Sequence, residues 1–367
     1  MPNEPADIPQ FLEDPPPFHR LLLSYGERPY WTRDGARIAF IERNYGDASE
    51  IDAATGKVRP LTAGLGDHHS FLRVLVLSNG DYLLIGPPEF TDRDVSRRVE
   101  SELWVLGQDL TRPPVRLGRR IFEGCGVSTL VPRITYAVSG RNDPSIGAPD
   151  VYECHVTDIV YGPDGPALGN DRVFYRTKGG LAPEPQDFRH GDTEVLFAEY
   201  HHDAVRGVTP ESMCVVKGYH LETGTFTTYI DEAYIHNEPE GIFPDHEYIC
   251  LESGCDSGGY PPRNLWKLRL DGSQRRVRMT DVPTDTRWRA TNSNVSPDGR
   301  WLAFMVGLKD DEAGYGRGLG LLDLEAWERS GKLEWETPTS RVVDGLPDIP
   351  YPEPTAALAT ASSAGRG

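Results

Sequence analysis

The sequence lacks long apolar runs, an excess of basic charge and paired cysteine motifs. No stretch of eighteen apolar residues occurs among the 367, so we expect no membrane-spanning helix. The formal net charge is −18 at pH 7, and a field of that sign repels nucleic acid and anionic membrane surfaces. We therefore expect neither nucleic acid nor a membrane as a partner.

Cysteines are few and follow no pattern. The chain has 5, an odd number with irregular spacing and no CxxC motif, which predicts free thiols in a reducing compartment. The first seventeen residues are acidic and proline-rich, without the basic start and apolar stretch of a secretory signal. These features together predict a cytoplasmic protein.

Sequence motifs for nucleotide binding are also missing. There is no P-loop, no Rossmann glycine fingerprint and no HExxH zinc motif. We therefore expect no nucleotide cofactor.

A hairpin motif, by contrast, recurs along the chain. Residues 31–40 (WTRDGARIAF) and 295–304 (VSPDGRWLAF) share a short strand, an Asp-Gly turn and an alternating apolar strand, which is a strong hairpin signal. Weaker copies cover residues 77–85, 131–140, 188–200 and 242–253, the last with His246 where glycine is expected. Six similar hairpins indicate a repeat architecture.

A second strand pair follows each hairpin, an apolar strand and then a more polar one, which gives four strands per repeat at intervals of roughly 40 to 60 residues. This pattern predicts an all-β, six-bladed β-propeller with four-stranded antiparallel blades. We expect the blades to begin near Arg28, His69, Phe122, Pro183, His236 and Arg289.

The segments outside these six repeats leave two arrangements open. Seven blades is the alternative if residues 19–25 and 340–345 build another sheet; otherwise one of these segments completes the last blade. We expect an N-terminal extension over residues 1–27 that offers a ring-closing strand, a propeller over 28–345 and a flexible tail over 346–367.

The SPDG hairpin followed by an apolar strand resembles the TolB-like family of propellers, over roughly residues 28–330. This resemblance implies the fold, and such propellers include both binding scaffolds and enzymes. A narrower resemblance is to the oligogalacturonate lyases, which carry Gln-x-x-His-x-His just before a Pro-Asp hairpin. Here His236 matches the first histidine, Glu238 stands in place of the second and Ala233 in place of the glutamine. The resemblance implies a divalent metal at the channel mouth, and a His-x-Glu pair suits Mn²⁺, Fe²⁺ or Zn²⁺.

Propeller geometry predicts where a site would lie. Residues just before the first strand of a blade and just after the second reach the same face of the ring, where propeller ligands bind. The candidates on this face are His68, His69, Arg141, His201, His202, His236, Glu238, Glu240 and Arg289.

We assign roles to these candidates by their chemistry. His236 and Glu238 would hold the metal together with His68, His69 or His201 from across the channel. Glu240 would point the same way as Glu238, and two such carboxylates repel each other unless a cation, a proton or an arginine such as Arg289 lies near them. His202 would remove a proton, while Arg141 or Arg289 would bind the substrate anion.

Three functions remain open at this stage. The first is an enzyme acting on a small polar or carbohydrate-like acid, of lyase or isomerase type, with assistance from a metal. The second is a non-catalytic propeller that binds a protein or peptide through the same face. The third is a metal-independent hydrolase that uses histidine and carboxylate groups.

Overall fold

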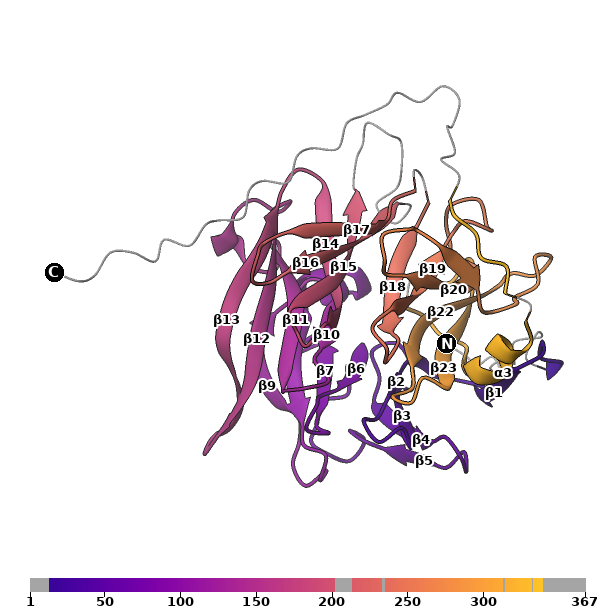
Figure 1. The fold of residues 1–367 in the computed structure, drawn as a ribbon. Coiled ribbons are helices and arrows are strands. Elements are labelled where there is room, and N and C mark those ends of the chain that lie inside the picture. The colour runs from indigo at the N-terminus through magenta and orange to yellow at the C-terminus, as the bar shows by residue number, and fades with distance from the viewer. Residues whose placement is uncertain (1–12, 202–212, 233–234, 313, 332, 339–367) are drawn as a thin grey trace.

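The protein forms a six-bladed β-propeller (Figure 1). The structure is a computed structural model that describes residues 13–201, 213–232, 235–312, 314–331 and 333–338. Each of the six sheets has four antiparallel strands, so the predicted all-β fold and the count of six blades are confirmed, and the described residues form no seventh sheet.

Five blades are built from consecutive strands. The first two contain β2 (Glu27–Trp31), β3 (Arg37–Ile41), β4 (Ala48–Asp52) and β5 (Val58–Pro60), then β6 (Arg73–Val76), β7 (Tyr82–Gly86), β8 (Glu102–Leu106) and β9 (Val115–Arg120). The third contains β10 (Cys125–Val127), β11 (Arg133–Ser139), β12 (Tyr152–Gly162) and β13 (Gly165–Thr177). The fourth and fifth contain β14 (Leu181–Arg189), β15 (Glu194–His201), β16 (Cys214–His220) and β17 (Phe226–Ile230), then β18 (Asn237–Ile242), β19 (Tyr248–Ser253), β20 (Asn264–Arg269) and β21 (Arg276–Arg278).

The sixth blade joins the two ends of the chain. Its strands β22 (Trp288–Val295), β23 (Trp301–Leu308) and β24 (Gly318–Asp323) come from the C-terminal part, and β1 (His19–Leu23) adds its outer strand. β1 is antiparallel to β24, with His19 opposite Leu322 and Leu23 opposite Leu319. The first strand of the chain therefore closes the ring.

The helical elements whose bounds the structure describes are all short. These are α2 (Arg93–Val95), the π-helical turn η1 (Ser96–Glu100), the 3-10 turn η2 (Pro144–Ile146) and α3 (Leu324–Arg329). No helix among the described residues is long enough and apolar enough to cross a membrane.

The turns of the repeated hairpins explain the sequence motif. Gly35 and Gly299 adopt φ angles of +67° and +74°, the left-handed conformation that glycine enters without steric cost. His246 takes the same position in its blade with φ +61°, which shows that the hairpin forms there without glycine. The Asp-Gly pairs therefore set hairpin geometry.

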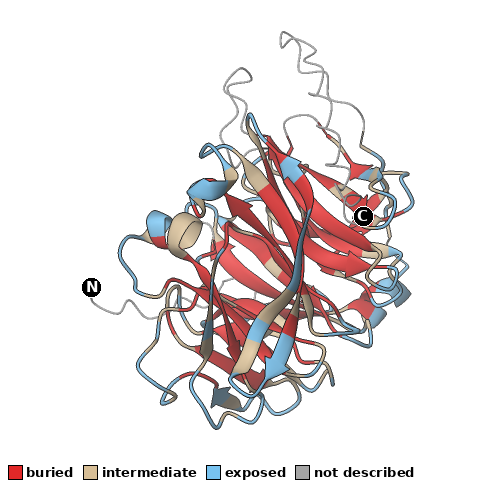
Figure 2. Cartoon of the chain, turned by 90° about the vertical axis from the view of Figure 1, so that its left-hand side faces the viewer, coloured by how far each residue is buried: buried red, intermediate tan, exposed pale blue. Residues whose placement is uncertain are grey.

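The apolar core lies between neighbouring blades, whose middle strands are almost wholly buried (Figure 2). The outermost strands are more exposed; in β9 half-buried and exposed positions alternate. All five cysteines are free thiols. The innermost strands differ from this apolar core, because they bury charged side chains that face the channel, among them Arg28, Glu184 and Glu240.

Candidate functional site

A cavity of about 110 Å³ lies on the axis of the ring, where the innermost strands begin. All six blades contribute to its wall. Arg28, Arg73, Glu240 and Asn292 line both this cavity and a smaller one of about 20 Å³. These four residues therefore separate the two spaces and form the floor of the larger one.

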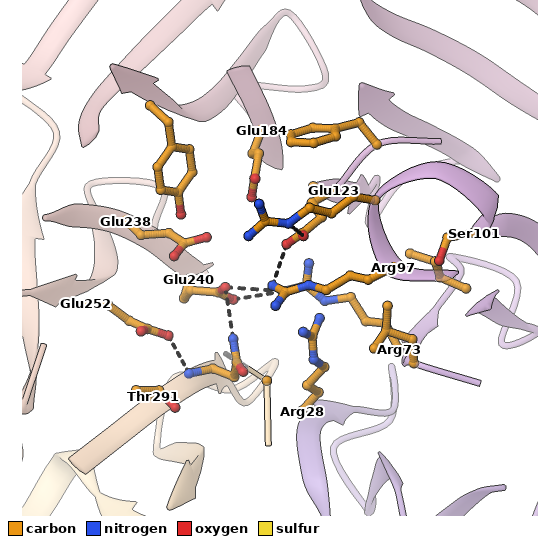
Figure 3. Close-up of a pocket in the computed structure, with 18 of the residues that line it drawn as sticks. Arg28, Arg73, Arg97, Ser101, Glu123, Glu184, Glu238, Glu240, Glu252 and Thr291 are labelled. Carbon is orange, nitrogen blue, oxygen red and sulfur yellow. Dashed lines mark hydrogen bonds and ion pairs between the residues drawn. The ribbon is translucent and has the colours of Figure 1, made fainter. Parts of the chain in front are cut away.

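Carboxylates gather on one side of the cavity (Figure 3). Glu184 comes from β14, Glu238 and Glu240 come from β18, and Glu252 comes from β19. Glu238 and Glu240 are two positions apart on one strand, so their side chains leave it on the same face. Glu252 stands directly opposite Glu238 in the β18–β19 ladder. Local strand geometry alone thus brings three of the four carboxylates together.

His236 completes this acidic side. It precedes β18, and its backbone is tied to the β19–β20 loop, since its N–H donates to the Gly259 carbonyl at 3.1 Å and its carbonyl accepts from Gly254 at 2.9 Å. Its Nε2 lies 3.3 Å from Glu238 Oε2, and its Nδ1 lies 3.6 Å from the Cys214 thiol. One ligand atom each from His236, Glu238 and Glu252 lie within 4.8 Å of one another. These three residues could hold a metal ion.

Glu238 is further oriented by two neutral groups. Gln186 Nε2 donates to Glu238 Oε1 at 3.2 Å, and the Tyr200 hydroxyl also bonds this carboxylate. Although burial opposes it, the hydrogen bond and charge of His236 hold the pKa of Glu238 below its ordinary value. Glu238 is therefore the carboxylate of this group that stays ionised.

The other three carboxylates have the opposite shift. Burial, and then the charges of Glu123 and Glu238, raise the pKa of Glu184 well above its ordinary value. Burial and the neighbouring glutamates do the same to Glu252, and they raise the pKa of Glu240 to about 7 against the attraction of Arg73. The buried carboxylates of the acidic side therefore repel one another, and a bound proton or cation would reduce this repulsion.

Arginines line the opposite side (Figure 3). Arg73 Nη2 lies 3.2 Å from both carboxylate oxygens of Glu240. The turn η1, inserted between β7 and β8, supplies Arg97 and Arg98, which lie 2.5 and 3.6 Å from Glu123. Arg28 from β2 lies beside them. The cavity thus has a basic end and an acidic end.

Four of the residues predicted from the sequence line this cavity, namely His236, Glu238, Glu240 and Arg289. Arg289 is buried, and its guanidinium reaches the Asp311 carbonyl at 3.5 Å. Glu240 pairs with Arg73, and no ion pair joins it to Arg289.

The structure does not bring the remaining described candidates to the cavity. His68 stacks on Trp104 with ring centroids 4.5 Å apart, and exposed His69 bonds Asp47 at 2.8 Å. Tyr200 faces the cavity, so strand alternation turns the next residue, His201, to the other side, where its Nε2 lies 3.3 Å from Glu199.

Two candidates remain, Arg141 and His202. Arg141 is exposed and lines neither cavity. His202 lies outside the described residues.

Several lining residues were not assigned from the sequence: Arg28, Arg73, Arg97, Glu184 and Glu252. The sequence did carry a signal for Arg28, Arg73 and Glu184, which lie on inner strands. A charged residue at the start of an otherwise apolar repeat is placed at the channel wall. Arg97 carried no such signal, because the turn that positions it interrupts the repeat.

Comparisons with known proteins agree on the fold. No family model matches the chain, and no curated protein matches it. Among solved structures, tricorn protease has a TM-score of 0.53 at 15% identity over 87% of this chain, which spans only 27% of that protein. A gluconolactonase from Xanthomonas campestris has a TM-score of 0.50 at 14% identity, covering 83% of this chain and 88% of that one.

A TolB protein from Acinetobacter baumannii has a TM-score of 0.46 at 13% identity, covering 83% of this chain and 66% of that one. TolB proteins are thus among the matched structures. The narrower resemblance to oligogalacturonate lyases gains no support from them. At these identities the likeness concerns the fold alone.

Proposed function

We propose that the protein is an enzyme that acts on a small polar or carbohydrate-like acid in the central cavity, with lyase or isomerase chemistry assisted by a divalent cation. The observation that carries this proposal is the convergence of His236, Glu238 and Glu252 within 4.8 Å in a cavity whose opposite wall is basic. One end suits a metal ion and the other suits an acid.

The donor set fits Mn²⁺, Fe²⁺ or Zn²⁺, because one imidazole and two carboxylates suit each of these ions. A cation between Glu238 and Glu252 would also offset the repulsion that raises the pKa of Glu252. When bound, such an ion supplies Lewis-acid polarisation of a substrate carbonyl or carboxylate.

The chain's own groups can hold and move protons at this site. Burial, and then the charges of Glu123 and Glu238, raise the pKa of Glu184 and so favour its protonated form, which makes it our candidate to donate a proton into the cavity. Glu240, with a pKa of about 7, is matched to exchange a proton near neutrality. His202, which lies outside the described residues, remains our sequence-based candidate for the base.

Metal analysis of the purified full-length chain tests the cation. We expect about one equivalent of Mn, Fe or Zn per chain after reconstitution, and a loss of roughly tenfold or more in affinity on His236→Ala. His69→Ala is the matched control, since His69 is exposed and lies off the cavity. Undiminished metal content in His236→Ala would discard this ligand set.

Catalysis is tested separately by proton NMR in D₂O with a panel of small sugar acids. Lyase or isomerase chemistry requires exchange or loss of the proton beside the carboxylate. We expect this exchange with wild type, and loss of it with Glu184→Gln if Glu184 supplies the proton. Tight binding of an acid without any exchange or turnover would favour a binding propeller instead.

A further inference from the structure

Arg28 is a buried cation that has no ion-pair partner among the described residues. Its side chain lines the cavity and points into it from β2, and the residue is only 8% exposed (Figure 3). Its Nε is buried without a hydrogen-bond partner, and no described residue forms an ion pair or a side-chain hydrogen bond with its guanidinium. A buried charge without a partner is costly, so its retention indicates a use.

The neighbouring arginines differ from Arg28 in this respect. Arg73 is matched by Glu240, and Arg97 is matched by Glu123. Burial, and then the repulsion of Arg97 and Arg73, lower the pKa of Arg28 to about 10 against the attraction of the more distant Glu123 and Glu27. The basic end therefore contains one positive charge that no carboxylate of the described residues contacts.

The backbone around Arg28 is shaped to keep its guanidinium in place. Gly314, in the loop between β23 and β24, has φ +77° and lies so close that an added Cβ would collide with Arg28 Nη2. The guanidinium is thus enclosed by backbone on that side, and its free donors are directed to the cavity.

We propose that Arg28 binds a carboxylate group of a small ligand, between Arg73 and Arg97. A guanidinium donates two parallel hydrogen bonds to a planar carboxylate. A monocarboxylate supplies the carboxylate partner that Arg28 lacks, whereas a phosphate dianion would meet stronger repulsion from Glu123 and Glu240 at the same end.

This anion site names a substrate class for the proposed enzyme, and it depends on the proposed function only for the claim that the bound acid is the substrate. With its carboxylate at Arg28, a small monocarboxylic acid would extend toward His236, Glu238 and Glu252. Hydroxyl or keto groups on that part of the ligand suit the acidic end. The class is therefore a hydroxy- or keto-monocarboxylic acid.

Calorimetric binding to the full-length chain tests the site. The probes are gluconate, galacturonate, lactate and acetate, with gluconamide as the neutral analogue and inorganic phosphate as the competing anion. We expect at least one carboxylate to bind wild type and to bind Arg28→Met at least tenfold more weakly, with Arg28→Lys between them. Arg141→Met is the matched control, since Arg141 is exposed and off the cavity, and it should bind like wild type.

Four results would overturn the assignment: no carboxylate binding to wild type, equal binding to Arg28→Met, gluconamide binding as tight as gluconate, or phosphate binding tighter than every carboxylate. A melting-temperature measurement shows whether the unliganded Arg28→Met protein is folded. Because the substitution removes a buried charge without an ion-pair partner, we expect a melting temperature at least as high as that of wild type. A clearly lower melting temperature would show that Arg28 has a structural partner and would also count against the site.

His236→Ala separates this inference from the proposed function. If Arg28→Met still weakens carboxylate binding in the His236→Ala background while wild type holds no metal, the anion site stands and the metal enzyme fails. If His236→Ala loses metal but Arg28→Met binds the carboxylate as tightly as wild type, the metal site stands and the anion site fails.

Discussion

At the scale of single residues, the buried carboxylate of Glu27 makes the free energy of unfolding depend on pH. One of its oxygens accepts the Gly316 N–H at 3.1 Å, and the other is buried without a partner. Burial raises its pKa to about 7 against the weaker pull of Gly316 and Arg28. Between pH 4.5 and 7 the folded state keeps a proton that the unfolded state has lost, so this group makes stability fall as pH rises through that window.

Glu27→Gln should remove this dependence, because glutamine does not titrate. We expect the variant's free energy of unfolding, relative to wild type, to increase from pH 5 to pH 8. Urea denaturation at both pH values measures it, with Glu247→Gln at an exposed position as the control. Parallel curves for wild type and Glu27→Gln would contradict the expected titration.

The ion pair between Arg73 and Glu240 is a second residue-scale case. The Arg73 and Glu240 side chains have 12% and 7% of their surface exposed, and Asn292 also donates to Glu240 at 3.2 Å. Arg73→Met should destabilise the protein by about 3–5 kcal/mol, because it leaves the Glu240 carboxylate buried beside Glu238 without its cation. Adding Glu240→Gln should recover most of that loss. Additive effects in thermal unfolding of the single and double variants would contradict a direct pairing.

At the scale of elements, ring closure depends on β1. Four of its residues pair with β24, and Leu22 and Leu23 pack on the core that contains Phe40. At about 1 kcal/mol for each paired residue, deleting residues 1–23 should cost about 4 kcal/mol, and it would also expose the β24 edge to self-association. Thermal unfolding and light scattering measure both effects. Deleting residues 1–12 is the control, and equal stability of the two truncated proteins would show that β1 does not hold the ring.

The elements also show how far sequence reasoning reaches. The hairpins could be predicted because each is fixed locally: Asp34-Gly35 and Asp298-Gly299 force a turn, and the alternating apolar strand that follows fixes which face is buried. His236 and Glu238 could be placed at the channel for the same reason, since they sit at the start of an inner strand.

The basic end could not be derived in this way. Arg28, Arg73 and Arg97 are spread over seventy residues, and they meet only after the ring closes. His68 and His201 failed to join them because side-chain direction, which strand alternation and local stacking set, decides whether a residue at the rim faces the cavity.

At the scale of the whole molecule, the charges of the cavity and of the chain act in opposite directions on an anionic ligand. The arginines attract it at short range, whereas the net charge of −18 repels it at long range. For a sphere of about 27 Å radius in water, the unscreened repulsion of one negative charge at the surface is about 3 kcal/mol. Salt reduces this barrier because the Debye length falls to about 10 Å at 0.1 M.

The association rate of a small carboxylate should therefore rise as salt is added at low ionic strength, while buried contacts such as that with Arg28 are screened less. Stopped-flow measurements between low salt and physiological salt, using whichever carboxylate binds, check this expectation. The neutral amide of the same acid is the control and should show little dependence. A carboxylate association rate that falls with salt would mean that the local field of the arginines, and not the net charge of the chain, governs the approach.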